Sequence, residues 1–159
     1  FAAIVGTVAG TASVIAADTL QIRGEGIPLV GVDAPESGQK CLAASQFFPC
    51  GAMAANALDN WINRASVSSD IEGKDRYDRL LGQCKVRGEN MQEWLVANGH
   101  AVAYRSYSTA YVPAELQARK TGAGIWAGEF VMPWDWRQGL RLTGEKPTKA
   151  MISGKFASN

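Results

Sequence analysis

The stretch IPLVGVDAPE, residues 27–36, predicts a β-strand that ends in a rigid acidic turn. Branched apolar residues fill its first half, and an Ala-Pro pair between Asp33 and Glu36 stiffens its end. Two carboxylates on such a turn can hold a hard cation or position a water molecule. The same residues also suit a plain turn, in which Asp33 accepts a capping hydrogen bond and Glu36 is solvated.

The sequence around this stretch alternates between strand and helix patterns. Alternating apolar residues predict further strands, and apolar residues at helical spacing predict three helices. The expected strands cover residues 11–24, 66–73, 79–88 and 101–104, and the expected helices cover residues 51–65, 89–100 and 113–126. This pattern favours an α+β fold, a five-stranded OB-type barrel with about three packed helices.

The composition is that of a globular chain: 47% of its 159 residues are hydrophobic and 19% are charged. A formal charge of +1 argues against nucleic-acid binding by bulk charge, so any anion site must be local. The apolar start FAAIVGTVAG is too short to span a membrane and is either a first strand or the remnant of a processed signal peptide. We expect one domain over residues 1–131 and a docked, partly flexible tail over 132–159, where no period is clear.

Cysteine placement bears on the cellular compartment. Cys41 and Cys50 flank the loop CLAASQFFPC, and a disulfide that closes this loop would imply an oxidising environment. The alternative is two reduced cysteines that are merely close in sequence. Cys84 lies in an alternating apolar run and is expected to be a buried, inert thiol.

Five segments in this order resemble the staphylococcal-nuclease-like (thermonuclease) family: SVIAADTLQI, IPLVGVDAPE, KDRYDRLLGQC, NMQEWLVANGHAVAY and GIW. The DAPE turn and the DRY loop, with a helix between them, are specific together. The resemblance implies an OB barrel that cleaves DNA and RNA phosphodiesters with Ca²⁺. The loop ending in PCG is similar to secreted members from Gram-negative bacteria, which implies a periplasmic or secreted protein. Those members often have a second cysteine pair, but Ser69 stands where the partner of Cys84 would be.

The family's metal and base positions are kept. The resemblance implies that Asp18 and Asp33 hold the calcium ion together with the carbonyl of Ala34. It also implies that Glu36 orients or deprotonates the attacking water. Ala16 and Ala17 stand where the family usually has Asp-Gly before the first aspartate.

The family's two phosphate-gripping arginines are not both kept. Arg79, in the DRY loop, matches one of them, while Pro28 stands where the other would be, and proline has no donor. Asp78 replaces the usual glycine before Arg79 and adds negative charge beside the phosphate site. The site is therefore expected to be impaired unless another cation fills the gap; the candidates by proximity in sequence are Arg23, Lys74 and Arg76.

Two functions remain open from the sequence. One is a calcium-dependent nuclease with weak or altered activity, in which Tyr104 and Arg105 could stack on a base; the alternative for Tyr104 is a plain surface or core residue. The other is a catalytically impaired module that binds nucleic acid or a protein partner, or docks a partner through its tail. A monomer is expected, and His100 is expected to be structural.

Overall fold

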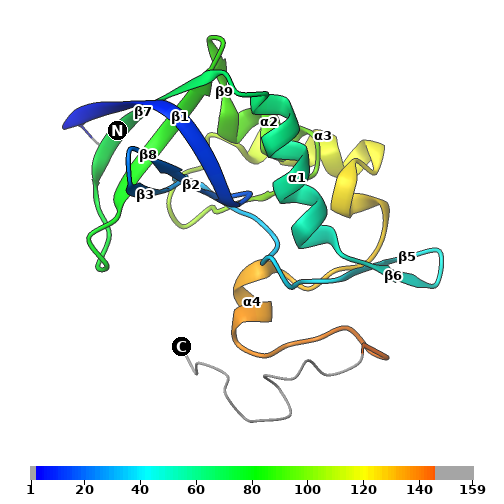
Figure 1. Ribbon diagram of the computed structural model, residues 1–159. Helices are drawn as coiled ribbons and strands as arrows, with labels where there is room; N and C mark the ends of the chain where they lie inside the picture. The colour runs from blue at the N-terminus through cyan, green and yellow to red at the C-terminus, as the bar shows by residue number, and fades with distance from the viewer. Residues whose placement is uncertain (1–2, 146–159) are drawn as a thin grey trace.

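The structure is a computed structural model that describes residues 3–145. Its centre is a six-stranded antiparallel sheet in the order β3-β2-β1-β7-β8-β9 (Figure 1). The strands are β1 (Gly6–Ala16), β2 (Thr19–Ile22), β3 (Glu25–Pro28), β7 (Ser66–Lys74), β8 (Leu80–Val86) and β9 (Glu89–Asn90). A parallel bridge between Leu29 and Gly82 joins the β3 end of the sheet to β8, and Val30 N–H donates to the Gly82 carbonyl at 3.0 Å. This closure confirms the expected α+β barrel.

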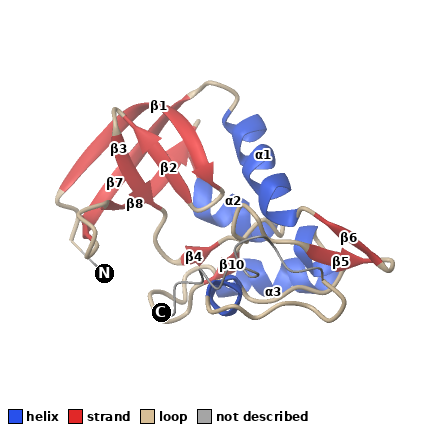
Figure 2. Ribbon diagram, turned by 60° about the horizontal axis from the view of Figure 1, so that its bottom comes forward, coloured by secondary structure: helices blue, strands red, loops and turns tan. Residues whose placement is uncertain are grey.

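The helices lie outside the sheet, with α1 (Cys50–Ile62) against β1 and α2 (Met91–Ala97) against β8 (Figure 2). They are α1 (Cys50–Ile62), α2 (Met91–Ala97), α3 (Val112–Thr121), the 3₁₀ turn η1 (Gly124–Ala127) and α4 (Pro133–Arg137). Helix α1 buries Ala54, Leu58 and Ile62, which recur every four residues and so lie on one face against the sheet. Among the residues described, no helix is long and apolar enough to cross a membrane.

The strand expected over residues 11–24 is wrong in one respect that matters for the site. The chain reverses at Ala17 and Asp18, and Ala16 pairs with Thr19 across a tight hairpin between β1 and β2. Alternating apolar residues continue on both sides of the turn, so their pattern does not reveal it. As a result Asp18 lies at a turn rather than inside a strand.

Two further elements lie outside the expected set. The cysteine loop forms a hairpin of β5 (Cys41–Ala43) and β6 (Gln46–Phe48), and its ends are joined by the predicted Cys41–Cys50 disulfide. Helix α4 lies in the segment that showed no period. The expected boundary at residue 131 stays a prediction, and much of the expected flexible tail lies outside the described residues.

Cys84 is a free, fully buried cysteine. It lies directly across from Ser69 on the neighbouring strand, with 2.6 Å between Oγ and Sγ. The interpretation that Ser69 stands opposite Cys84, in place of a second cysteine, therefore agrees with the strand register.

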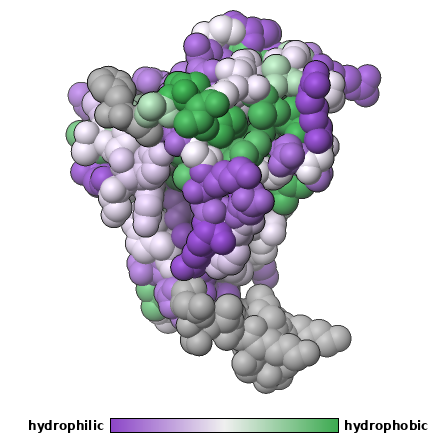
Figure 3. All heavy atoms as spheres, turned by 90° about the vertical axis from the view of Figure 1, so that its left-hand side faces the viewer, coloured by the Kyte–Doolittle hydropathy of each residue, from purple (hydrophilic) through white to green (hydrophobic). Residues whose placement is uncertain are grey.

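The outer surface is mixed in character. Ile4 and Val5, near the start of β1, are 50% and 71% exposed. Figure 3 shows apolar side chains gathered in the upper part of one face of the molecule, with hydrophilic side chains around and below them. This surface agrees with a formal charge near zero and directs attention to local pockets.

Candidate active site

The acidic turn and the β1–β2 turn meet in one place. Asp33 ends the short strand β4 (Val32–Asp33), which pairs with β10 (Val102–Ala103). Ala34 N–H donates to the Asp18 carboxylate at 2.9 Å, and Leu29 N–H donates to the Asp18 carbonyl at 2.8 Å. These bonds fix the two turns against each other, so that Asp18 and Asp33 face the same pocket.

This pocket is a cavity of about 600 Å³. Its lining includes the carboxylates of Asp18, Asp33 and Glu36, together with Arg79 and Pro28. Asp33 is buried, with 8% of its side chain exposed, whereas 31% of the Glu36 side chain is exposed at the rim. The structure therefore brings four of the predicted polar site residues, and the position of the missing arginine, into one cavity.

The electrostatics of Asp18 reflect this crowding. The pKa of Asp18 is raised to about 7, by burial above all; the neighbouring Asp33 and Glu36 also raise it, and the Ala34 N–H lowers it. A carboxyl group in these surroundings is costly to ionise without a nearby cation. The pocket is thus a place where a positive charge is stabilised.

Arg79 is held by the loop that carries it. The Asp75 carboxylate accepts bonds from the backbone N–H groups of Tyr77 and Arg79, and from the Arg79 Nε at 2.8 Å. Burial raises the pKa of Asp75, but these hydrogen bonds together lower it more, so its net pKa falls below the usual value. Asp75 is therefore ionised at neutral pH and fixes the guanidinium at the pocket wall.

Asp78 was expected to add negative charge beside the phosphate site, but it lies outside the pocket. Its backbone has φ of +65°, a conformation that glycine adopts most easily, which gives a reason for a glycine at this place. Its carboxylate lies 3.2 Å from Lys74 Nζ on the exposed surface, and it is absent from the described residues that line the pocket. The negative charge of Asp78 therefore lies outside this pocket.

A cation that sequence reasoning missed lies in the pocket. Arg137, the last residue of α4, donates from both terminal nitrogens to the two Asp33 oxygens, at 3.0 and 2.8 Å. One of these nitrogens also donates to Glu36 at 2.6 Å. The hydrogen bonds to Asp33 raise the pKa of Arg137, partly opposed by burial, so its charge is permanent.

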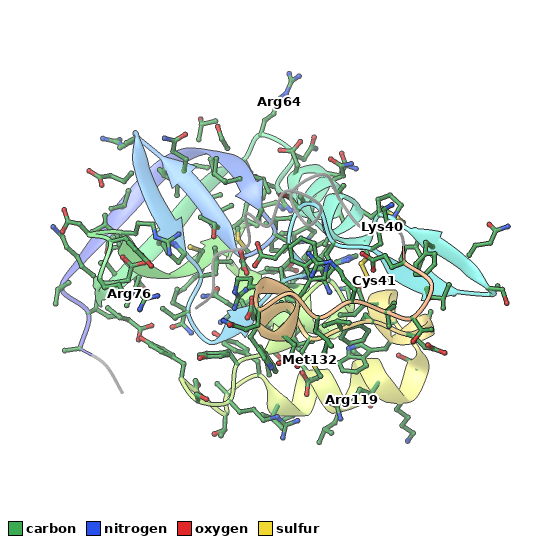
Figure 4. The ribbon with its side chains drawn as sticks, turned by 90° about the horizontal axis from the view of Figure 1, so that it is seen from below. Lys40, Cys41, Arg64, Arg76, Arg119 and Met132 are labelled. Carbon is green, nitrogen blue, oxygen red and sulfur yellow. A yellow bond between two sulfur atoms is a disulfide. The ribbon has the colours of Figure 1, made fainter. Side chains whose placement is uncertain are left out.

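The substitute cations expected from sequence proximity lie elsewhere. Arg23 Nε donates to the Ala9 carbonyl at 2.7 Å, and Arg76 stacks on the Tyr77 ring at 4.9 Å. Lys74 pairs with Asp78. Figure 4 shows Arg76 well apart from Met132, the residue that precedes α4. Among the described residues that line the pocket, the arginines are Arg79 and Arg137.

Tyr104 connects this pocket to a second cavity of about 460 Å³. The second cavity is lined in part by Arg105 and Trp134, and the Tyr104 and Trp134 rings are 5.9 Å apart. Arg105 donates to the buried Glu115 at 2.8 Å. The two residues that were expected to contact a base are thus exposed beside the acidic pocket.

His100 is not among the described residues that line the acidic pocket. Its ring lies 5.2 Å from that of Trp94, and burial lowers its pKa. A neutral imidazole packed on an indole fits the expected structural role.

The pocket offers a calcium ion few protein ligands. Among the residues described, no group of three or more His, Cys, Asp or Glu side chains is arranged to hold a metal. The carboxylates of Asp18 and Asp33 both line the pocket, and carboxylate oxygens are ligands that calcium prefers when water and substrate supply the rest; Ala34 is not among the described residues of the lining. Asp18 is deeply buried and crowded by Asp33 and Glu36, which raises its pKa, and a nearby cation relieves such crowding.

Comparison with known proteins agrees with this geometry. The model of the family described as staphylococcal nuclease homologue matches residues 26–128. The succinoglycan biosynthesis protein ExoI of Rhizobium meliloti (strain 1021) is 37% identical over 124 residues, 76% of this chain and 65% of ExoI. An uncharacterized endonuclease of Haemophilus influenzae is 31% identical over 115 residues, 70% of this chain and 60% of that protein.

A staphylococcal-like nuclease of Arabidopsis thaliana is 30% identical over 118 residues, 72% of this chain but 34% of the plant protein. The chain thus spans less than two thirds of each of these relatives. The matched region contains the acidic turn, Arg79 and Tyr104, and ends before α4. With its OB-type barrel and its acidic pocket, the chain belongs to the staphylococcal nuclease family.

Proposed function

We propose that this protein is a calcium-dependent phosphodiesterase that cleaves DNA or RNA. The observation that carries the proposal is the convergence of Asp18, Asp33, Glu36 and Arg79 on one open cavity. Asp18, Asp33 and the Ala34 carbonyl would hold the ion. When bound, calcium would offset negative charge at the phosphate and favour ionisation of a water molecule.

The chain's own groups supply the remaining chemistry. Glu36 lies at the exposed rim, where its carboxylate can take a proton from a water molecule as that water attacks phosphorus. Arg79 is held by Asp75 with 45% of its side chain exposed, so it can donate to the phosphate oxygens where charge builds. Tyr104 lines both cavities and Arg105 lines the second, which supports a role for them in contacting an adjacent nucleotide.

The proposed location is the periplasm or the extracellular space. The Cys41–Cys50 disulfide supports it, because structural disulfides persist in oxidising compartments. Mass spectrometry of protein isolated from each cell fraction under alkylating conditions would test it. A chain found in the cytoplasm with free Cys41 and Cys50 would contradict the proposal.

The activity is tested with supercoiled DNA and single-stranded RNA, each with calcium or with EDTA. We expect calcium-dependent cleavage that Asp33→Asn abolishes and that the exposed matched control Asp59→Asn leaves intact. Cleavage that persists in EDTA, or in Asp33→Asn, would contradict the assigned metal site.

A module that binds nucleic acid without cleaving it is the second candidate. Pro28 lines the pocket where an arginine would grip phosphate, and this observation favours reduced turnover. Binding of single-stranded DNA without cleavage, over a range of calcium concentrations, would favour this candidate.

A further inference from the structure

We propose that Arg137 is the second phosphate-binding arginine of this site and supplies, from outside the family domain, the cation that is absent at Pro28. The inference deepens the proposed nuclease function and rests on it. Helix α4 follows residue 128, where the family match ends, so the residue comes from a part of the chain that the family model does not include.

The first support is the placement of the guanidinium. Arg137 and Pro28 line the same cavity, and Arg137 reaches two of the three carboxylates that the proposed reaction uses, Asp33 and Glu36. Its three hydrogen bonds use three of the five N–H groups of an arginine. With 42% of the side chain exposed, the group can still donate from its free edge to a phosphate in the cavity.

The second support is the way that the chain fixes this segment. Gln39, which is fully buried, donates to the Val131 carbonyl at 2.6 Å just before α4. Met132 and Trp134 pack on the buried cluster that contains the Cys41–Cys50 disulfide. Arg137 therefore starts from a backbone that is tied to the domain, which lowers the entropic cost of holding its side chain in the pocket.

The third support is that the proposed site needs a second positive charge to bind a phosphate. Arg79 is the other arginine of the described lining, and its Nε is already engaged by Asp75. A phosphate that gains charge in the transition state needs a fixed, forked donor. Among the described residues of the pocket, Arg137 can supply this forked donor. It is not one of the residues that the family resemblance assigns to the site.

The rival role is a tethered competitor, in which Arg137 neutralises Asp33 and Glu36 and only obstructs the metal. The two roles predict opposite effects of removing the side chain. A competitor's loss would tighten calcium binding and raise turnover, whereas a phosphate ligand's loss would weaken substrate binding and lower turnover.

The experiment uses the full chain and compares Arg137→Ala and Arg137→Lys with the wild type. Arg23→Ala is the matched control, since it removes an arginine that lies outside the pocket. The readouts are calcium affinity by calorimetry, binding of a short phosphorothioate single-stranded DNA by fluorescence anisotropy, and kcat/KM on unmodified DNA. Thermal unfolding shows that each variant is folded.

We expect Arg137→Ala to weaken phosphorothioate DNA binding about tenfold or more, because a charge-assisted bond contributes at least about 1.5 kcal/mol. Its kcat/KM should fall by a factor on the order of 10³, as for other transition-state arginines. Arg137→Lys should retain part of the binding, since it keeps the charge but loses the fork. Adding Pro28→Arg to Arg137→Ala should restore binding.

Unchanged or tighter DNA binding with increased turnover in Arg137→Ala would overturn the proposal in favour of the competitor. Equal losses in Arg23→Ala would also overturn it, because the effect would then be one of net charge. A wild type that binds DNA through Arg137 but never cleaves it would refute the proposed activity while upholding this inference. A wild type that binds no DNA would refute the inference.

Discussion

The buried side chain of Gln39 donates a 2.6 Å hydrogen bond to the carbonyl of Val131. The same amide accepts a hydrogen bond from the backbone N–H of Glu36 at 3.1 Å. One side chain thus joins the acidic turn to the segment that carries α4. The position of Arg137 relative to Glu36 is set by this link as well as by their own ion pair.

Replacement of Gln39 by Leu should destabilise the protein and loosen the site together. The change leaves Glu36 N–H and the Val131 carbonyl without these partners, at a cost of about 2–4 kcal/mol in unfolding free energy. Urea denaturation measures the loss of unfolding free energy, and fluorescence anisotropy measures the weaker binding of phosphorothioate DNA. Gln117→Leu, on the exposed face of α3, is the control, and an equal loss there would mean that the link has no special role.

Glu36→Gln should lower kcat by a factor of about 10² to 10⁴, because the amide cannot take a proton from water. DNA binding should be kept within a few fold, since the amide keeps the shape and can still accept from Arg137. Glu93→Gln, at an exposed helix position, should behave as the wild type. Near-normal cleavage by Glu36→Gln would remove Glu36 from the proposed reaction.

Gly51→Ala should displace the acidic turn. A Cβ at Gly51 would overlap the carbonyl oxygen of Glu36, because the first turn of α1 packs directly against the backbone there. We expect a loss of about 1–3 kcal/mol in unfolding free energy, typical of overpacking, with reduced cleavage. Gly6→Ala, where a Cβ meets nothing within 4 Å, is the matched control. A fully stable and active Gly51→Ala would contradict this packing.

Ser69→Cys should create a second disulfide with Cys84. The two residues are paired directly across β7 and β8 and are separated by 15 positions in sequence. Closing such a loop should stabilise the oxidised protein by about 3 kcal/mol. Mass spectrometry under non-reducing conditions measures the bond, and two titratable thiols in the folded variant would show that the strands do not allow it.

Alkaline pH should destabilise the protein through Cys84. Burial raises the pKa of this thiol from 9.0 to about 11, partly opposed by Ser69. Between these values the folded thiol keeps a proton that the unfolded chain loses, so stability falls as pH rises. The loss should reach about 2–3 kcal/mol near pH 11. Urea denaturation from pH 8 to 11 measures this loss of unfolding free energy, and Cys84→Ala should not show it. The same fall in unfolding free energy with pH in both proteins would refute the prediction.

The sequence by itself determined the elements with a clear local period. Alternation identified the strand regions of the barrel but not the turn between β1 and β2, helical spacing identified α1 and α2, and Pro113 marked the first turn of α3. The resemblance carried by the DAPE turn and the DRY loop indicated Asp33, Glu36 and Arg79, which the fold gathers in one pocket. These features were accessible because hydrophobic period and turn chemistry act over a few neighbouring residues.

Only the tertiary structure showed that Arg137 binds Asp33 and Glu36. It lies 104 positions from Asp33, on a helix of five residues that is too short to show a period. Its placement follows from Met132 and Trp134 packing beside the disulfide and from Gln39 binding Val131. Such contacts join segments that are distant in sequence, and their energy comes from burial and pairing that no local pattern encodes.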